Sequence, residues 1–154
     1  MVLARPLHGC RHKYGVTLKK TTSIRNTGEN KEQLMQKEHQ LAEAVEAALD
    51  KKAQDLIWLD LTGICSFTDI FIVCTGTSSR HSQSIADNIE EKLKRHGVRP
   101  LHTEGRGEAD WILMDYVDFV VHIFSARARE FYDLERLWRT GKRRDIHELI
   151  GQPT

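Results

Sequence analysis

The sequence predicts an α/β domain with a mixed β-sheet covered by helices. Apolar residues recur at helical spacing in three stretches, and short runs of β-branched and aromatic residues lie between them. The resulting order is helix, strand, strand, helix, strands, helix, which is typical of this fold class. With 154 residues, 40% of them hydrophobic, the chain fits one domain with a modest core. A formal net charge of +1 gives no chain-wide basic excess that would favour nucleic acid as the main partner.

Residues 1–33 differ in composition from the residues that follow. Lys and Arg recur there and no acidic residue precedes Glu29, so we expect a basic, disordered leader. The predicted domain covers residues 34–140, and residues 141–154 are expected to form a polar tail. No apolar run approaches the roughly 20 residues that a membrane-spanning helix needs. We therefore expect a cytoplasmic protein, or a mitochondrial one if the leader is a transit peptide.

The first half of the domain is predicted to hold a helix and two strands. The helix covers residues 34–52, because its apolar positions fall on one side of a helical projection. These positions are Leu41, Val45, Ala48 and Leu49. Two buried strands follow at residues 55–61 and 69–76, and Gly63 provides backbone freedom in the turn between them.

A second helix is expected after these strands. Ser78 or Ser79 caps its start, Gly97 ends it and Pro100 prevents it from resuming. Its apolar stripe consists of Ile85, Ala86, Ile89 and Leu93.

Further strands are predicted at residues 110–116 and 118–124, with a short edge strand at 101–104. Residues two apart in a strand point to the same face of the sheet. In the first of these strands, one face therefore carries Trp111, Leu113 and Asp115, and the other carries Ile112 and Met114.

The segment "EFYDLERLW", from Glu130 to Trp138, is predicted to form one closing helix. At about 100° per residue, its apolar side chains fall in one arc and are expected to pack on the sheet. These are Phe131, Leu134, Leu137 and Trp138. Tyr132 falls on the far side, beside charged residues, where it is either an interface anchor or a lone surface tyrosine.

No catalytic residue, cofactor or metal site is expected from the motifs. The turn "CTGTSSRH" precedes a helix start that could hold an anion near Gly76–Arg80, but it matches no nucleotide-binding motif. Asp115 and Asp118 lie three apart across a turn, which is the wrong spacing for a two-metal site. His122 is expected to be a hydrogen-bonded histidine of the core or of the sheet edge, and not a metal ligand or a base. The leader motif "HGCRH" offers three metal ligands but no second cluster.

Three stretches together resemble the ribosomal silencing factor family, also called RsfS or Iojap-like. They are "SFTDIFIVCTGTSSRHSQSIADNIEEKL", "GRGEADWILMDYVDFVVHIF" and "REFYDLERLW". The match runs from about Gln36 to about Trp138, with the motifs in the family's order. It implies a nucleotidyltransferase-like fold without the catalytic carboxylates.

The resemblance also implies a function without enzymatic activity. Family members bind the large ribosomal subunit through large-subunit ribosomal protein fourteen and block joining of the small subunit, which represses translation. A role as a ribosome-assembly factor on the same surface is one alternative. A nucleotide-binding or nucleotidyltransferase enzyme that uses Gly76–Arg80 is the other. A homodimer of the free protein is a further implication, and the basic stretch "GKRRD" is a candidate for a nearby rRNA contact.

The family's docking residues correspond to positions in this chain. Trp111 and Tyr132 are the two aromatic residues around which the docking surface forms, and the charged neighbours are Asp133, Glu135 and Arg136. Many members have glycine where this chain has Val117. Because a valine does not readily adopt a positive φ, we expect the connection between these strands to differ from a tight glycine turn.

Overall fold

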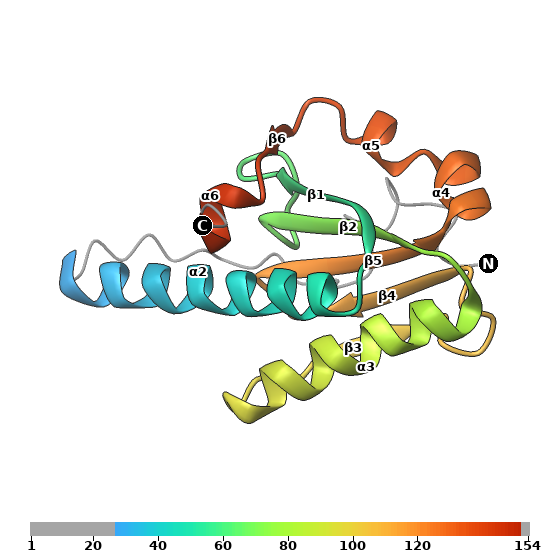
Figure 1. Ribbon diagram of the computed structural model, residues 1–154. Helices are drawn as coiled ribbons and strands as arrows, with labels where there is room; N and C mark the ends of the chain where they lie inside the picture. Colours follow the sequence, from blue (N-terminus) through green and yellow to red (C-terminus); the bar gives the residue numbers. More distant parts are fainter. Residues whose placement is uncertain (1–26, 152–154) are drawn as a thin grey trace.

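The computed structural model describes residues 27–151, which form a six-stranded β-sheet with helices on both faces (Figure 1). The elements are α2 (Thr27–Asp50), β1 (Gln54–Asp60), β2 (Ile70–Gly76), α3 (Ser79–Arg95), β3 (His102–Glu104), β4 (Trp111–Asp115), β5 (Phe119–Ser125), α4 (Ala126–Tyr132), α5 (Leu134–Leu137), β6 (Lys142–Arg144) and α6 (His147–Ile150). The α/β class predicted from the sequence is confirmed. No helix among these residues combines the length and the apolarity that crossing a membrane requires.

The sheet is mixed, as predicted. Its strand order is β3-β4-β5-β2-β1-β6. The central strands β2 and β5 are parallel, with Ile70 opposite Phe119 and Gly76 opposite Ser125. The other neighbouring strands pair antiparallel. The short strand β3 lies at one edge, where the sequence predicted an edge strand.

Two apolar clusters fill the space on opposite faces of the sheet. In β4, Ile112 and Met114 join the larger cluster, whereas Trp111 and Leu113 join the smaller one. This division confirms the two-residue alternation predicted for the strand. The helices over the larger cluster bury Leu41, Ala44, Val45, Ala47, Ala48, Ile85, Ala86, Ile89 and Leu93. The smaller cluster is covered by the short α4 and α5.

Both ends of α3 follow local sequence signals. Ser78 caps α3, because its side-chain oxygen accepts a hydrogen bond from the His81 N–H at 3.1 Å. Gly97 follows α3 with a φ of +76°, which glycine adopts without strain. The helix α2 begins at Thr27 and not at residue 34. The preceding part of the predicted leader, including "HGCRH", lies outside the described residues.

The predicted polar tail begins with part of the sheet. Strand β6 pairs antiparallel with β1, with Arg144 opposite Trp58, and forms the edge of the sheet opposite β3. The Arg144 guanidinium lies 5.6 Å from the centre of the Trp58 ring, within the range of a cation–π contact. Gly141 allows the chain to enter β6, because a Cβ there would collide with the Leu61 side chain. The expectation of a tail outside the domain is therefore wrong for the described residues up to 151.

The connection between β4 and β5 keeps the geometry of a glycine turn although valine occupies it. Val117 has a φ of +74°, and the Asp118 N–H donates a hydrogen bond to the Tyr116 carbonyl at 2.9 Å. This is a γ-turn centred on Val117. The expectation that the valine would change this connection is wrong. The pairing of β4 with β5 holds the turn closed, so Val117 is kept in a strained backbone conformation.

Replacing Val117 with glycine is expected to stabilise the domain by about 1 kcal/mol. A left-handed conformation costs an L-residue about 1–2 kcal/mol, and glycine returns about half of that gain through its greater chain entropy. Urea unfolding followed by circular dichroism measures the change. Val117→Ala is the matched control, because alanine keeps a Cβ and hence most of the strain. A Val117→Gly variant less stable than Val117→Ala would contradict this account of the turn.

Candidate functional site

Trp111 lies inside the smaller cluster and not on the surface. It is 3% exposed, and its ring centre is 4.9 Å from that of Phe124 and 4.7 Å from that of Tyr132. Its Nε1–H donates a hydrogen bond to Nδ1 of buried His122 at 3.0 Å, so His122 is the hydrogen-bonded core residue that the sequence predicted. Trp111 thus contacts Tyr132 as predicted neighbours would, but it is buried under the Tyr132 ring and does not reach the surface.

The closing segment is not the single helix that the sequence predicted. Asp133 adopts a left-handed conformation, with φ +43° and ψ +56°, which ends α4 at Tyr132. A separate short helix, α5, begins at Leu134. Aspartate tolerates this region better than most residues, because its short polar side chain can form local hydrogen bonds. The break redirects every side chain after Tyr132 relative to a continuous helix.

The break divides the predicted apolar stripe into buried and exposed members. Leu134 and Trp138 are 1% and 5% exposed and belong to the smaller cluster. Phe131 is 80% exposed and Leu137 is 41% exposed. The prediction that these last two side chains pack on the sheet is wrong, because one unbroken helical phase does not run through Asp133.

Tyr132 is half-buried. One side of its ring packs on Trp111 and completes the smaller cluster. The Phe131 ring stands edge-on to it, with 5.0 Å between ring centres. The prediction that Tyr132 stands apart from the core is therefore wrong in part. The tyrosine is held in one position by the core and still presents part of its surface to solvent.

Arg129 ties α4 to α5 and to the sheet. Its Nε and Nη2 atoms donate to Glu135 Oε1 at 3.0 and 2.7 Å. Its Nη1 atom donates to the Asp55 carbonyl at 2.6 Å and to Thr75 Oγ1 at 2.8 Å. The Arg129 side chain is only 13% exposed and that of Glu135 is 28% exposed, so water screens the pair only partly. Glu135, a predicted docking residue, is therefore engaged within the fold.

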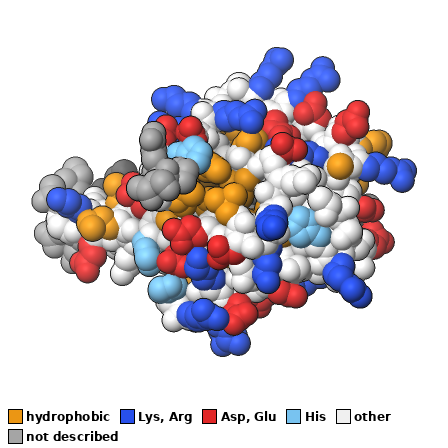
Figure 2. All heavy atoms as spheres, viewed as in Figure 1, with side chains coloured by type: hydrophobic (Ala, Val, Ile, Leu, Met, Phe, Trp, Pro, Cys, Tyr) orange, Lys and Arg blue, Asp and Glu red, His pale blue; other side chains and the backbone are white. Residues whose placement is uncertain are grey.

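The exposed part of this segment forms what we call the α4–α5 surface. It consists of Phe131, Leu137, Arg136 and the accessible parts of Tyr132 and Asp133. Figure 2 shows hydrophobic atoms between charged groups at its upper right, where Figure 1 places α4 and α5. Sequence reasoning missed Phe131 and Leu137 as surface residues. The aspartate was the only local signal for the break, and it is a weak one.

The Gly76–Arg80 turn uses its polar groups internally. The Thr77 N–H donates to His81 Nδ1 at 2.9 Å, and the His81 N–H donates to Ser78 Oγ. Because Nδ1 accepts, the proton of the His81 ring lies on Nε2 and points to the Lys51 carbonyl, 2.5 Å away. Gly76 serves close packing, since a Cβ there would collide with Ser82. These contacts favour a structural role for this helix start and disfavour a role in binding an anion.

The environments of Cys74, Asp115 and Asp118 do not favour a reactive group among the described residues. Burial raises the pKa of the Cys74 thiol to about 12, with a smaller opposing effect from the charge of Arg129. Cys74 is therefore a protonated core residue at neutral pH. Asp115 is buried and accepts a hydrogen bond from the Val117 N–H, whereas Asp118 is exposed. The two carboxylates thus occupy different environments.

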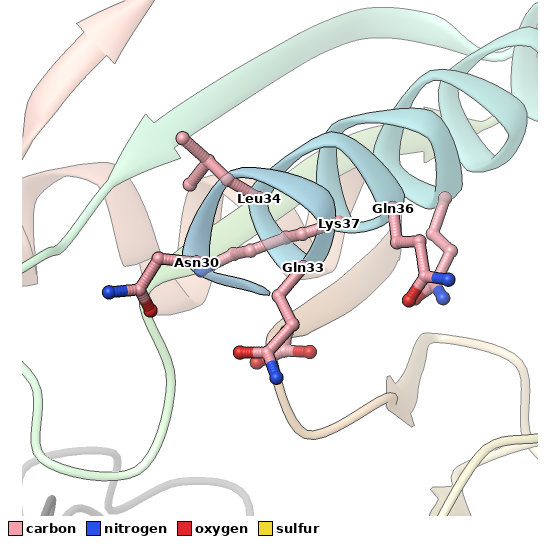
Figure 3. Close-up of a pocket in the computed structure, with 7 residues that line it drawn as sticks. Asn30, Gln33, Leu34, Gln36 and Lys37 are labelled. Carbon is pink, nitrogen blue, oxygen red and sulfur yellow. The ribbon is translucent and has the colours of Figure 1, made fainter. Parts of the chain in front are cut away.

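A pocket lies along the first turns of α2 (Figure 3). It is lined by Asn30, Gln33, Leu34, Gln36, Lys37, Gln40 and Asp118. Lys37 reaches across to Asp69, with 2.6 Å between Nζ and Oδ2, and so connects α2 to the start of β2. The lining is mostly amide and charged side chains on one helix. It brings together no nucleophile with a base, so we do not assign a reaction to it.

Comparison with known proteins places this geometry in a family. A Bacillus subtilis protein named ribosomal silencing factor RsfS is 37% identical over 109 residues, which cover 71% of this chain and 92% of that protein. A mouse protein named mitochondrial assembly of ribosomal large subunit protein 1 is 29% identical over 91 residues, covering 57% of this chain and 40% of that protein.

A solved structure agrees with the fold. The crystal structure of a Chromobacterium violaceum protein superposes with a TM-score of 0.62 at 37% identity and covers 67% of this chain and 85% of that one. The family model described as "Ribosomal silencing factor during starvation" matches residues 34–153. This range includes β6 and α6, which the sequence resemblance had left outside. The chain therefore belongs to the ribosomal silencing factor family.

Proposed function

We propose that this protein is a translational repressor without enzymatic activity. It binds the large ribosomal subunit through large-subunit ribosomal protein fourteen and sterically blocks joining of the small subunit. Family membership supports the ribosome as the partner. The observation that carries the proposal is the α4–α5 surface, where Phe131 is 80% exposed although its own segment is firmly anchored.

The α4–α5 surface has the composition of a protein-binding hot spot. Tryptophan, tyrosine and arginine are enriched among residues whose loss weakens a protein interface, and phenylalanine is enriched at interfaces generally. Here Phe131 and the accessible part of Tyr132 supply the aromatic contact, and Arg136 and Asp133 supply a polar rim. Trp111 and Glu135 act indirectly, because they hold Tyr132 and α5 in place.

The anchoring of α4 and α5 favours high affinity, because these helices do not have to become ordered when a partner binds. The Arg129 contacts to Glu135, Asp55 and Thr75 fix the segment before any partner arrives. A side chain held in its bound position loses less conformational entropy than a mobile one. Obstruction of subunit joining needs only such affinity and the volume of the domain, so no reacting group is required.

Two alternative functions are supported to different degrees. A ribosome-assembly factor would use the same surface, and the name of the mouse relative favours this role for that protein. A nucleotide-binding enzyme at Gly76–Arg80 is less favoured, because the polar groups of that turn are engaged with each other. A nearby rRNA contact remains a further part of the proposal. The exposed residues Lys142 and Arg143 of β6 carry positive charges that would attract its phosphate groups.

The location and the oligomeric state of the protein are also proposals, which rest on the family resemblance and on the composition of the leader. We propose a cytoplasmic protein, and a mitochondrial one is the alternative if the basic leader directs import. We also propose that the free protein forms a homodimer. Size-exclusion chromatography with light scattering distinguishes a dimer from a monomer.

The double variant Phe131→Ala/Tyr132→Ala is expected to lose about 2 kcal/mol or more of binding free energy, which is roughly a 30-fold loss of affinity. Co-sedimentation with cognate large subunits measures this loss. Leu101→Ala is the matched control, since it removes an apolar side chain that is 62% exposed next to β3. If the folded double variant co-sediments as well as the control, the α4–α5 surface is not the docking site.

A subunit-joining assay is expected to separate repression from assembly. Purified mature subunits are mixed with the protein, and the joined ribosomes are resolved from free subunits on a sucrose gradient. A repressor lowers the joined fraction in proportion to the large subunits it occupies, and the double variant does not. A protein that acts only in assembly leaves this fraction unchanged and co-sediments with immature particles instead.

A further inference from the structure

We propose that His39, Glu43 and His96 form a zinc-binding site that joins α2 to α3. The site lies on the helical layer of the domain, on the face of the sheet opposite α4 and α5. It is independent of the docking function proposed above, and no step of that function requires it.

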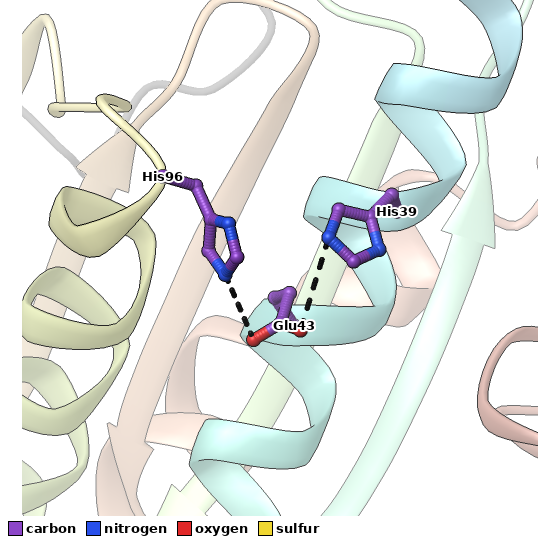
Figure 4. A group of neighbouring side chains, drawn as sticks. All are labelled: His39, Glu43 and His96. Atoms are coloured by element: carbon purple, nitrogen blue, oxygen red, sulfur yellow. Dashed lines mark ion pairs between the residues drawn. The ribbon is translucent and has the colours of Figure 1, made fainter.

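The geometry of the site comes from two helices (Figure 4). His39 and Glu43 are four residues apart on α2 and therefore lie on the same side of it. His96 directly follows α3 and faces them across the helix pair. The distances from His39 Nε2 and His96 Nε2 to the nearer carboxylate oxygens of Glu43 are 3.9 and 3.7 Å. One ligand atom from each residue lies within 4.8 Å of the others.

This set matches the ligands that zinc prefers. Two imidazole nitrogens and one carboxylate are a known ligand set for zinc, with a water molecule in the fourth position. Ligand atoms bound to one tetrahedral zinc ion lie about 3.4 Å apart, given metal–ligand distances of about 2.1 Å. The two histidine–glutamate distances of 3.9 and 3.7 Å are close to this value, whereas separations within the whole group reach at most 4.8 Å, so the side chains must move together to bind one ion. The His39 and His96 side chains are 60% and 45% exposed, so both rings have room to turn inward.

Lys92 is the main competitor for the carboxylate. Its Nζ atom lies 3.9 Å from Glu43 but 3.2 Å from Glu46 and 3.6 Å from Asp50. Burial disfavours its charge, but the hydrogen bond to Glu46 and the three carboxylates together raise the pKa of Lys92. The lysine therefore stays charged and retains two closer partners when Glu43 turns to a metal ion. Its nearby positive charge weakens zinc binding, so we expect weaker binding than at a closed structural site with four protein ligands.

The bound ion would fix the two helices to each other. Their apolar contact is already buried around Ala44, Ala47 and Ala48, whereas His39 lies where α2 becomes exposed. A metal ion that binds the folded state and not the unfolded state raises stability by mass action. Zinc would therefore stabilise the domain at the junction of α2 with the end of α3.

The test must exclude the leader, because "HGCRH" offers ligands of its own. The reference protein is the full chain with His8→Ala, Cys10→Ser and His12→Ala. Calorimetric titration with ZnCl₂ alone measures its affinity, and thermal unfolding with and without zinc measures the stabilisation. The test variants add His39→Ala, His96→Ala or Glu43→Gln. His102→Ala is the control, because His102 is an exposed histidine paired with a glutamate outside this site.

The reference protein and the His102→Ala control are expected to bind zinc with equal affinity and to unfold at a higher temperature when zinc is present. Each of the three test variants is expected to lose at least about tenfold in affinity, and the shift in unfolding temperature should disappear. Circular dichroism without metal establishes that each variant is folded. Should Glu43→Gln disturb the Lys92 ion pairs, the two histidine variants decide the matter, since they remove exposed rings. Zinc affinity that is absent in the reference protein, or unchanged in His39→Ala and His96→Ala, overturns the proposal.

Discussion

The packing of Trp111 against Tyr132 is the contact on which the proposed docking surface depends. One face of the sheet is closed by two long helices, but the other is covered by the short α4 and α5, which are too short to be stable helices alone. Their position is therefore set by tertiary contacts. The ring of Trp111, held by its hydrogen bond to His122, supplies the apolar floor, and Arg129 supplies polar ties to the sheet.

This arrangement explains how one short segment can both cover a core and present an aromatic surface. In a continuous helix the apolar side chains share one face, so burying some of them buries all. The left-handed Asp133 breaks that rule. It directs Leu134 and Trp138 into the core while Phe131 stays in solvent. Phe131 therefore adds little to the core, and its exposure on an anchored segment supports the proposed docking role.

The sequence predicted those parts of the fold that short-range periodicity determines. The alternation in β4 and the stripes of α2 and α3 follow from burial on one side of a regular element, so residues such as Ile112 and Ile85 could be placed correctly. The break at Asp133 could not be predicted, because an aspartate is compatible with both a helical and a left-handed conformation. The choice depends on tertiary contacts, in which Arg129 binds Asp55 and Thr75, two residues distant in the sequence. The γ-turn at Val117 was missed for a related reason. There the pairing of two strands outweighs the local preference of valine. The proposed docking residues came from the family resemblance, and the structure shows which of them reach solvent.

The two faces of the sheet also separate the two proposed binding events. The histidine–glutamate group lies on α2 and α3, which pack on the larger cluster, whereas the α4–α5 surface stands over the smaller one. A metal ion bound between the helices therefore does not cover the docking surface. Any influence on docking would have to pass through the central strands, and β2 and β5 contribute buried residues to both clusters, including Ile72 and Phe71 on opposite faces. Because these strands are packed on both sides and paired along their whole length, they resist the sliding that such coupling needs. The ion would thus change how firmly the domain is folded and leave the affinity of the α4–α5 surface for its partner unaltered.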